Sequence, residues 1–397
     1  MPTLTFPEAR RYVLDMVRAN RSTPAVEETG IDYAGGRILA RDIPADRDYP
    51  PLARSLRDGF AVRAADLPGK LRIVGEVRAG ESYQGEVCQG EAVEIMTGAP
   101  VPPGADAIVM VEHTVREGDT VLVSNATEPG RFINPRGAEV RDGQPVVRAG
   151  TRIDYAAIAM LAAVGRGVVP VYCRPVVSII PTGDEIVEAG QAPRDYQIRN
   201  SNAGSLAEQV RRAGGIPHVL PVARDEAAHT RAMIERGLAA DMMLLSGGVS
   251  AGKYDIVERV LADLGAEFFF DRVLIQPGQP LVFGRAARRF FFGLPGNPAS
   301  TMVTFELFAR AALELLAGLD ETMLPMPLAR LTTGFRHSPG LTRFLPARLS
   351  PDGAEVTPVT WRGSSDVPAV TRANAYLVAD PARAEWLPGE LIPVLLK

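Results

Sequence analysis

Residues 241–263 read DMMLLSGGVSAGKYDIVERVLAD: a short apolar run, a loop of small residues, and a segment whose apolar residues have helical spacing. The apolar run has the length of a buried strand. In the loop, Gly247 and Gly248 let the backbone turn sharply and let a ligand approach the amide nitrogens. A tight turn between strand and helix would by itself explain the two glycines. Ser250, Lys253 and Asp255 add a hydroxyl, a cation and a carboxylate, which favours a binding loop.

The same alternation of strand and helix extends from residue 174 to about residue 318. Short loops between alternating strands and helices predict a parallel sheet that helices cover on both faces. The predicted strands are residues 175–180, 216–222, 241–246 and 266–275, and the predicted helices are residues 205–214, 226–239, 254–265 and 301–318.

The pattern changes outside this region. Residues 7–20 and 154–165 have helical spacing, and between them short β-like runs are cut by Gly and Pro at close intervals. Short strands and turns return after residue 328. We therefore predict a multidomain α/β protein with a central parallel-sheet α/β domain, two small mainly-β domains, and a helical, elongated N-terminal domain that contains both outlying helices. The predicted domains are residues 1–45 with 146–173 (helical N-terminal), 46–145 (inserted β), 174–320 (α/β) and 321–397 (C-terminal β).

The composition argues against several classes of protein. A formal net charge of −4 and a pI near 5.8 disfavour general nucleic-acid binding. Two distant cysteines and four scattered histidines disfavour a thiolate or HExxH zinc site. The apolar stretch YAAIAMLAAVG is far shorter than the ~20 residues of a membrane span, and the N-terminus has no signal-peptide pattern. We expect a cytoplasmic protein that binds neither nucleic acid nor membrane.

Polar loops follow the predicted strands of the α/β region. An open parallel sheet binds ligands beyond the carboxyl ends of its strands, so these loops should meet at one edge. Gly-rich backbone there can cradle phosphates, and clustered carboxylates near phosphates usually hold Mg²⁺. The sequence therefore predicts a site for a phosphorylated, nucleotide-like ligand with a metal. The loops are PTGDE at 181–185, ARDE at 223–226, SGGVSAGKYD at 246–255, IQPGQP at 275–280, and FFFGLPGNPAS at 290–300.

Two upstream motifs, SLRDGFAV at 55–62 and IMTGAPVPPGADAIV at 95–109, complete a resemblance over essentially the whole chain. Together with PTGDE, SGGVSAGKYD and LPGNPAS they resemble the molybdopterin molybdenumtransferase (MoeA) family, which includes the gephyrin E domain. The resemblance implies an elongated homodimer with an α/β domain of the molybdopterin-binding type. It implies that adenylylated molybdopterin and molybdate give molybdenum cofactor and AMP, with Mg²⁺ or another divalent cation. It also implies a cleft between the α/β domain of one subunit and the β domain of its partner. A molybdopterin adenylyltransferase would be the pathway partner.

The family's site residues are carried over only where the motifs match. The resemblance implies a catalytic set of five carboxylates, three of which would hold the metal, and a larger set of substrate-binding residues. The catalytic set is Asp58, Glu139, Glu185, Asp225 and Asp255, and the metal ligands are Glu185, Asp225 and Asp255. The substrate-binding set is Thr182, Gly183, Asn202, Ser246, Gly247, Gly248, Ser250, Gln276, Gln279, Pro280, Asn297, Ser300 and Ser364. Turn capping would explain Asp58 and Glu139 without a catalytic role.

Three positions depart from the family pattern. The family usually has Lys at both basic positions of a KPGKP-type loop, where this chain has Gln276 and Gln279. A later family Arg is replaced by Pro346. Each change removes positive charge near the molybdate end, which should weaken oxyanion binding unless another cation reaches in. The candidate cations are Arg199, Lys253, Arg272, Arg343 and Arg348.

Two other functions are open on the sequence. One is a scaffold or anchoring protein, or a molybdopterin-binding homologue with weak or no molybdenum insertion; a partner-binding tail or long linker would favour anchoring, and the sequence shows neither. The other is an adenylyltransferase or nucleotide hydrolase that shares the α/β domain. The flanking β segments with TGAPVPPGADAIV argue against that second alternative.

Overall fold

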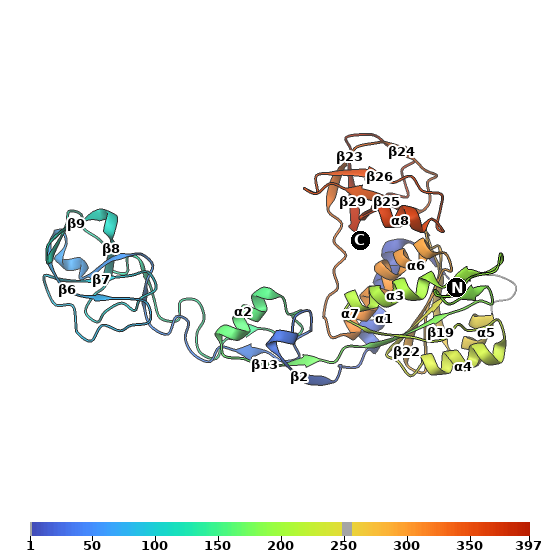
Figure 1. Cartoon of the computed structure of the whole chain (residues 1–397), viewed down its shortest axis with the longest axis horizontal. Coiled ribbons are helices and arrows are strands. Elements are labelled where there is room, and N and C mark those ends of the chain that lie inside the picture. Colours follow the sequence, from blue (N-terminus) through green and yellow to red (C-terminus); the bar gives the residue numbers. More distant parts are fainter. Residues whose placement is uncertain (1, 248–255) are drawn as a thin grey trace.

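The chain is elongated in the computed structural model, which describes residues 2–247 and 256–397 (Figure 1). A β domain lies at one end, a small module with helix α2 (Tyr155–Ala163) lies in the middle, and the α/β domain lies at the other end. The C-terminal β domain packs beside the α/β domain. The chain therefore contains several separate hydrophobic clusters rather than one core.

The sheet of the α/β domain is mixed, so the prediction of a purely parallel sheet was wrong. Its strand order is β1-β19-β21-β22-β18-β14-β17, and only β21 runs against the others. β21 and β22 form a hairpin whose turn residues Ala287 and Arg288 have φ values of 46° and 67°. A tight turn with two positive φ angles joins antiparallel strands, and this one lacks the Asn-Gly signal that would have revealed it. The strands are β1 Thr3–Leu4, β14 Val176–Pro181, β17 Ile216–Val219, β18 Met242–Ser246, β19 Glu267–Val273, β21 Pro280–Ala286 and β22 Arg289–Leu294.

Helices cover both faces of this sheet, as predicted. One face packs against α1, α3, α6 and α7, and the other packs against α4 and α5. Each helix buries an apolar stripe, for example Leu206, Ala207 and Val210 of α3. The bounds are α1 Phe6–Asn20, α3 Ser201–Arg212, α4 Ala227–Gly237, α5 Ile256–Asp263, α6 Pro298–Thr304, a π-helix at Phe305–Ala309, and α7 Arg310–Leu316.

Helix α1 belongs to the α/β domain, which corrects the prediction that it shares a domain with α2. Ala9, Val13 and Val17 are fully buried in the cluster that contains the sheet and α7. Strand β1, just before α1, adds to the sheet edge beside β19. The four-residue spacing of Ala9, Val13 and Val17 gives α1 one apolar face. Periodicity does not indicate which sheet that face will contact.

Replacing Val13 with Ala tests this placement. Val13 is 0% exposed, so losing two methyl groups should lower the free energy of unfolding of the α/β domain by about 1–2 kcal/mol. Denaturant unfolding measures the change. Val26→Ala is the matched control because Val26 is 43% exposed in the middle module, and it should change stability by less than about 0.5 kcal/mol. Equal losses in the two variants would contradict a core role for α1.

The middle module contains α2 and two pairs of short strands from both sides of the inserted domain. Leu39, Leu161 and Val169 are fully buried in its cluster. Its strands are β2 Val26–Gly30 paired with β13 Val168–Tyr172, and β3 Ile43–Pro44 paired with β12 Pro145–Val147.

The inserted domain is a six-stranded sheet of order β8-β5-β7-β6-β10-β9. The strands are β5 Gly59–Val62, β6 Gly69–Val77, β7 Glu91–Ile95, β8 Ala107–Met110, β9 Thr114–Glu117 and β10 Thr120–Val123, with the pair β4 Arg54–Ser55 and β11 Ile133–Asn134 beside them.

The C-terminal domain is a second six-stranded sheet, β20-β25-β26-β23-β29-β27, with helix α8 (Val367–Arg372). Its edge strand β20 comes from the α/β domain, so the two domains share a sheet. The strands are β20 Ile275–Gln276, β23 Leu328–Leu331, β25 Thr342–Leu349, β26 Glu355–Pro358, β27 Ala375–Ala379 and β29 Leu391–Leu396. Two short strand pairs lie outside the large sheets. They are β15 Ile186–Val187 with β16 Ile198–Arg199, and β24 Phe335–Arg336 with β28 Glu385–Trp386.

Candidate functional site

The five predicted loops begin at the same edge of the α/β sheet. Strands β14, β17, β18 and β22 are parallel, and β19 has the same direction because β21 is antiparallel to both β19 and β22. Each strand is followed by one of the loops that the sequence indicated. The strand directions therefore confirm that these loops meet along one edge, where an α/β sheet binds its ligands.

Close backbone packing holds the middle loops together. The Thr182 amide donates to the Ser246 carbonyl at 3.1 Å, and the Gly247 amide donates to the Leu294 carbonyl at 3.2 Å. Gly247 has φ +96°, and a Cβ on it would lie 3.0 Å from the Thr182 carbonyl oxygen. Only glycine combines this backbone angle with so close an approach. These bonds therefore join the ends of β14, β18 and β22 into one floor where the three loops begin.

Asn202 crosses this floor from the first turn of α3. Its Nδ2 donates to Ser246 Oγ and to the Gly296 carbonyl, both at 2.8 Å. Its buried Oδ1 has no hydrogen-bond partner in the described part of the chain. A buried acceptor without a donor is costly, so Oδ1 is suited to accept a hydrogen bond from a ligand or from water.

The acidic end of the site lies at β14 and β17. The Asp225 amide donates to Asp184 Oδ1 at 3.2 Å, and Arg224 Nη1 donates to the Asp184 carbonyl at 3.2 Å. Asp184 and Arg224, which were not predicted as site residues, thus hold the two acidic loops together. The only sequence signal for Arg224 is its place beside Asp225. At Gly183, a Cβ would lie 2.4 Å from Glu185 Oε2, so glycine leaves room for that carboxylate.

Glu185 and Asp225 are exposed carboxylates on neighbouring loops, and their hard oxygen donors suit Mg²⁺. Mg²⁺ is commonly held by one or two carboxylates together with substrate phosphates, so this donor set fits such an ion. Within residues 2–247 and 256–397, no group of three or more His, Cys, Asp or Glu side chains could hold a metal. The predicted site residues Gly248, Ser250 and Asp255, and the candidate cation Lys253, lie outside the described residues.

The opposite end of the site combines the α/β and C-terminal domains. Gln276 lies on β20 opposite Arg343 of β25, and the Gln279 carbonyl accepts from the Val273 amide at 3.0 Å, just before Pro280. The Ala299 amide donates to the Ser364 carbonyl at 2.9 Å. Buried Ser300 and exposed Asn297 belong to the same α6 start. These predicted substrate-binding residues therefore lie together at the junction of the two domains.

Asp58 and Glu139 lie far from these loops within one chain, because the inserted domain extends away from the α/β domain (Figure 1). Asp58 Oδ1 accepts from the Thr97 amide at 2.6 Å and from Thr97 Oγ1 at 2.7 Å. These bonds, the amide first, lower the pKa of Asp58, so its carboxylate is charged at neutral pH. Glu139 accepts from Asn134 Nδ2 at 3.0 Å. Thr97 and Asn134 position the two carboxylates, and neither was predicted from the sequence.

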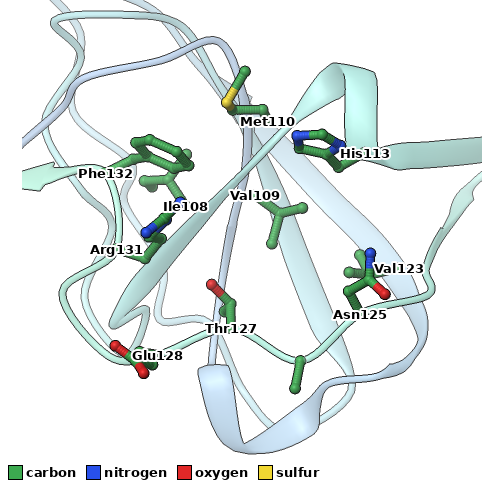
Figure 2. A pocket seen from close by; sticks show the side chains of 11 residues that line it. Ile108, Val109, Met110, His113, Val123, Asn125, Thr127, Glu128, Arg131 and Phe132 are labelled. Carbon is green, nitrogen blue, oxygen red and sulfur yellow. The ribbon is translucent and has the colours of Figure 1, made fainter.

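A separate pocket of about 500 Å³ lies in the inserted domain, between β8 and the loop that follows β10 (Figure 2). Its walls combine Ile108 and Val123 with the polar side chains of His113 and Asn125. None of the predicted site residues lines it. A smaller pocket of about 430 Å³ contains Glu139 at the junction with the middle module.

Comparison with known families covers nearly the whole chain. Residues 4–165 match "MoeA N-terminal region (domain I and II)", residues 178–315 match "Probable molybdopterin binding domain", and residues 328–397 match "MoeA C-terminal region (domain IV)". No helix in the described part of the chain is long and apolar enough to cross a membrane.

Named relatives and a solved structure are similar to this chain over most of its length. A molybdopterin molybdenumtransferase of Nostoc sp. is 36% identical over 350 residues, which is 85% of this chain and 80% of that protein. One of Bacillus subtilis is 33% identical over 375 residues, 91% of this chain and 87% of that protein. The crystal structure of the molybdopterin biosynthesis moeA protein from Pyrococcus horikoshii OT3 is 28% identical, with a TM-score of 0.84 over 100% of both chains.

Proposed function

The chain belongs to the MoeA family and is a molybdopterin molybdenumtransferase, and from this premise we propose which residues bind the substrates and which hold the metal. The reaction inserts molybdenum from molybdate into adenylylated molybdopterin and releases AMP. The observation that carries the proposal is the meeting of five polar loops at one sheet edge, with acids at one end and the domain junction at the other.

The floor of the site binds the adenylylated substrate. Gly183 and Gly247 have no side chain, so the loops that contain them leave room for phosphate oxygens close to the backbone. Asn202 Oδ1 is buried and has no partner among the described residues, so it accepts a hydrogen bond from a donor group of the substrate. Holding both substrates along one sheet edge converts their encounter into a local step.

Glu185 and Asp225 would hold a divalent cation, with Mg²⁺ as the first candidate. When bound, such an ion neutralises negative charge on the phosphates and on the departing AMP. The support is the chemistry of two exposed carboxylates on loops that Asp184 and Arg224 hold together.

A homodimer would complete the site. Asp58 and Glu139 cannot reach the α/β domain of their own chain, because the middle module separates the two regions (Figure 1). They would therefore act on the site of a second subunit. The middle module also exposes Tyr33 by 79% and Tyr155 by 90%, and large exposed apolar side chains are typical of a subunit interface. A molybdopterin adenylyltransferase would supply the adenylylated substrate.

Titration of the purified protein with adenylylated molybdopterin tests the proposed function. AMP should be released in proportion to cofactor formed when molybdate and a divalent cation are present. Tight binding of the adenylate without AMP release at any molybdate concentration would instead support a molybdopterin-binding homologue that does not insert the metal.

Replacing Gln276 and Gln279 together with Lys should lower the molybdate concentration needed for half-maximal cofactor formation. An ammonium binds an oxyanion more strongly than a neutral amide, by about 1–2 kcal/mol, which is about five- to thirtyfold in affinity. Adenylate binding should not change, because that part of the substrate lies over the β14 and β18 loops. An unchanged molybdate midpoint would show that another cation already supplies the charge.

A further inference from the structure

The structure describes four of the five candidate cations for the oxyanion end, and their surroundings differ. Lys253 lies outside the described residues. Arg199 is exposed and its Nε donates to the Gln191 carbonyl at 3.0 Å. Arg272 and Arg348 are also exposed. Only Arg343 is partly buried, so it alone among the four described candidates loses part of its solvation.

Arg343 lies directly opposite Gln276. Strands β20 and β25 are parallel, with Ile275 paired to Thr342 and Gln276 paired to Arg343. Paired residues of neighbouring strands project from the same face of a sheet, about 5 Å apart. The side chain of Arg343 therefore leaves the backbone beside residue 276, on the same face of the sheet. A lysine at position 276 would put its charge on this face too.

The Arg343 guanidinium group lacks a counter-ion in the described part of the chain. Its Nη2 donates to the Ser338 carbonyl at 3.2 Å, whereas its buried Nε has no hydrogen-bond partner there. No carboxylate of the described residues forms an ion pair with it. Burial lowers the pKa of Arg343 from its ordinary value, as expected for a charge that no acid compensates. A partly buried cation with a free donor is suited to bind an anion.

The position of Arg343 along the edge indicates which of the two anionic substrates it would contact. Acids Glu185 and Asp225 follow β14 and β17, whereas β20 follows β19. Four strand spacings separate β14 from β19, which is on the order of 19 Å at about 4.8 Å per spacing. The nucleotide phosphates and a metal would lie at the acidic end. The cationic end is therefore left for the other anionic substrate.

We propose that Arg343 binds molybdate and supplies one of the positive charges that Gln276 and Gln279 do not provide. This inference rests on the proposed function, because it takes molybdate as the second substrate. Arg343 acts through its guanidinium N–H groups, which can donate two parallel hydrogen bonds to one tetrahedral oxyanion.

Arg343→Gln tests the proposal through the dependence of cofactor formation on molybdate concentration. The half-maximal molybdate concentration should rise about five- to thirtyfold, while the Kd for adenylylated molybdopterin stays within about twofold of wild type. Arg348→Gln is the matched control, since it makes the same change on the same strand at an exposed position. It should leave the molybdate midpoint unchanged.

A double-mutant cycle distinguishes charge from structure. Adding Gln276→Lys to Arg343→Gln should restore most of the lost molybdate affinity, whereas Gln276→Lys alone should gain less than it gains in the Arg343→Gln background. An unchanged midpoint in folded Arg343→Gln, or an equal rise in Arg348→Gln, overturns the proposal. If Arg343→Gln does not fold, Gln276→Glu puts a carboxylate opposite Arg343, and an unchanged midpoint there overturns it as well. Wild-type protein that forms no cofactor at any molybdate concentration would overturn the proposed function instead.

Discussion

AMP release by the Asp225→Asn variant is expected to be about ten- to a hundredfold slower than in the wild type at a fixed Mg²⁺ concentration. Asparagine keeps the size of the side chain but has no charge, so the cation would lose one of its two proposed carboxylate ligands. Losing even an outer-shell partner typically costs ten- to a hundredfold in metal affinity or activity. The measurement is AMP release against Mg²⁺ concentration, and the half-maximal Mg²⁺ concentration should rise in the variant.

Asp184→Asn is the matched control for this prediction. It removes the same charge from the same pair of loops, but Asp184 Oδ1 accepts from the Asp225 amide at 3.2 Å and so has a positioning role. We expect the half-maximal Mg²⁺ concentration of Asp184→Asn to stay within about threefold of wild type. An Asp225→Asn rate within twofold of wild type, at low and high Mg²⁺, would rule out Asp225 as a ligand.

The edge of the sheet could be predicted from the sequence because it depends on local pattern. Apolar runs followed by Gly or Asp mark strand ends, and parallel strands bring those ends together whatever their order. This is why Thr182, Asn202, Ser246 and Gly247 meet as a hydrogen-bonded floor. Whether they bind substrate is still a prediction.

Long-range pairing could not be predicted in the same way. The burial face of α1 was clear from Ala9, Val13 and Val17, but the sheet that receives it was not. Arg343 could be named only as one of five cations, because its place opposite Gln276 depends on a strand pair that joins two domains. Periodicity gives the face of an element and leaves its partner open.

Gly278→Ala is expected to lower the free energy of unfolding by about 2–6 kcal/mol. Gly278 has φ +103°, and this backbone conformation costs a residue with a side chain about 1–3 kcal/mol. An added Cβ would also lie 2.4 Å from Thr304 Cγ2. Thr304 cannot turn away, because it is 0% exposed and its Oγ1 donates to the Ser300 carbonyl at 2.8 Å. Such overpacking adds about 1–3 kcal/mol.

Two other glycines of the α/β domain separate these contributions. Gly265 has φ +76° and open space around it, so Gly265→Ala should show the backbone cost alone. Gly204 lies within α3 with open space and no positive φ, so Gly204→Ala should raise stability by about 0.5–1 kcal/mol. Denaturant unfolding should therefore show the largest loss of stability for Gly278→Ala, a smaller loss for Gly265→Ala and a gain for Gly204→Ala. Because Gly278 lies between the two glutamines, its variant should also raise the molybdate midpoint, which the other two should leave unchanged. Equal losses at Gly278 and Gly265 would mean that Thr304 gives way and that the loop does not depend on this contact.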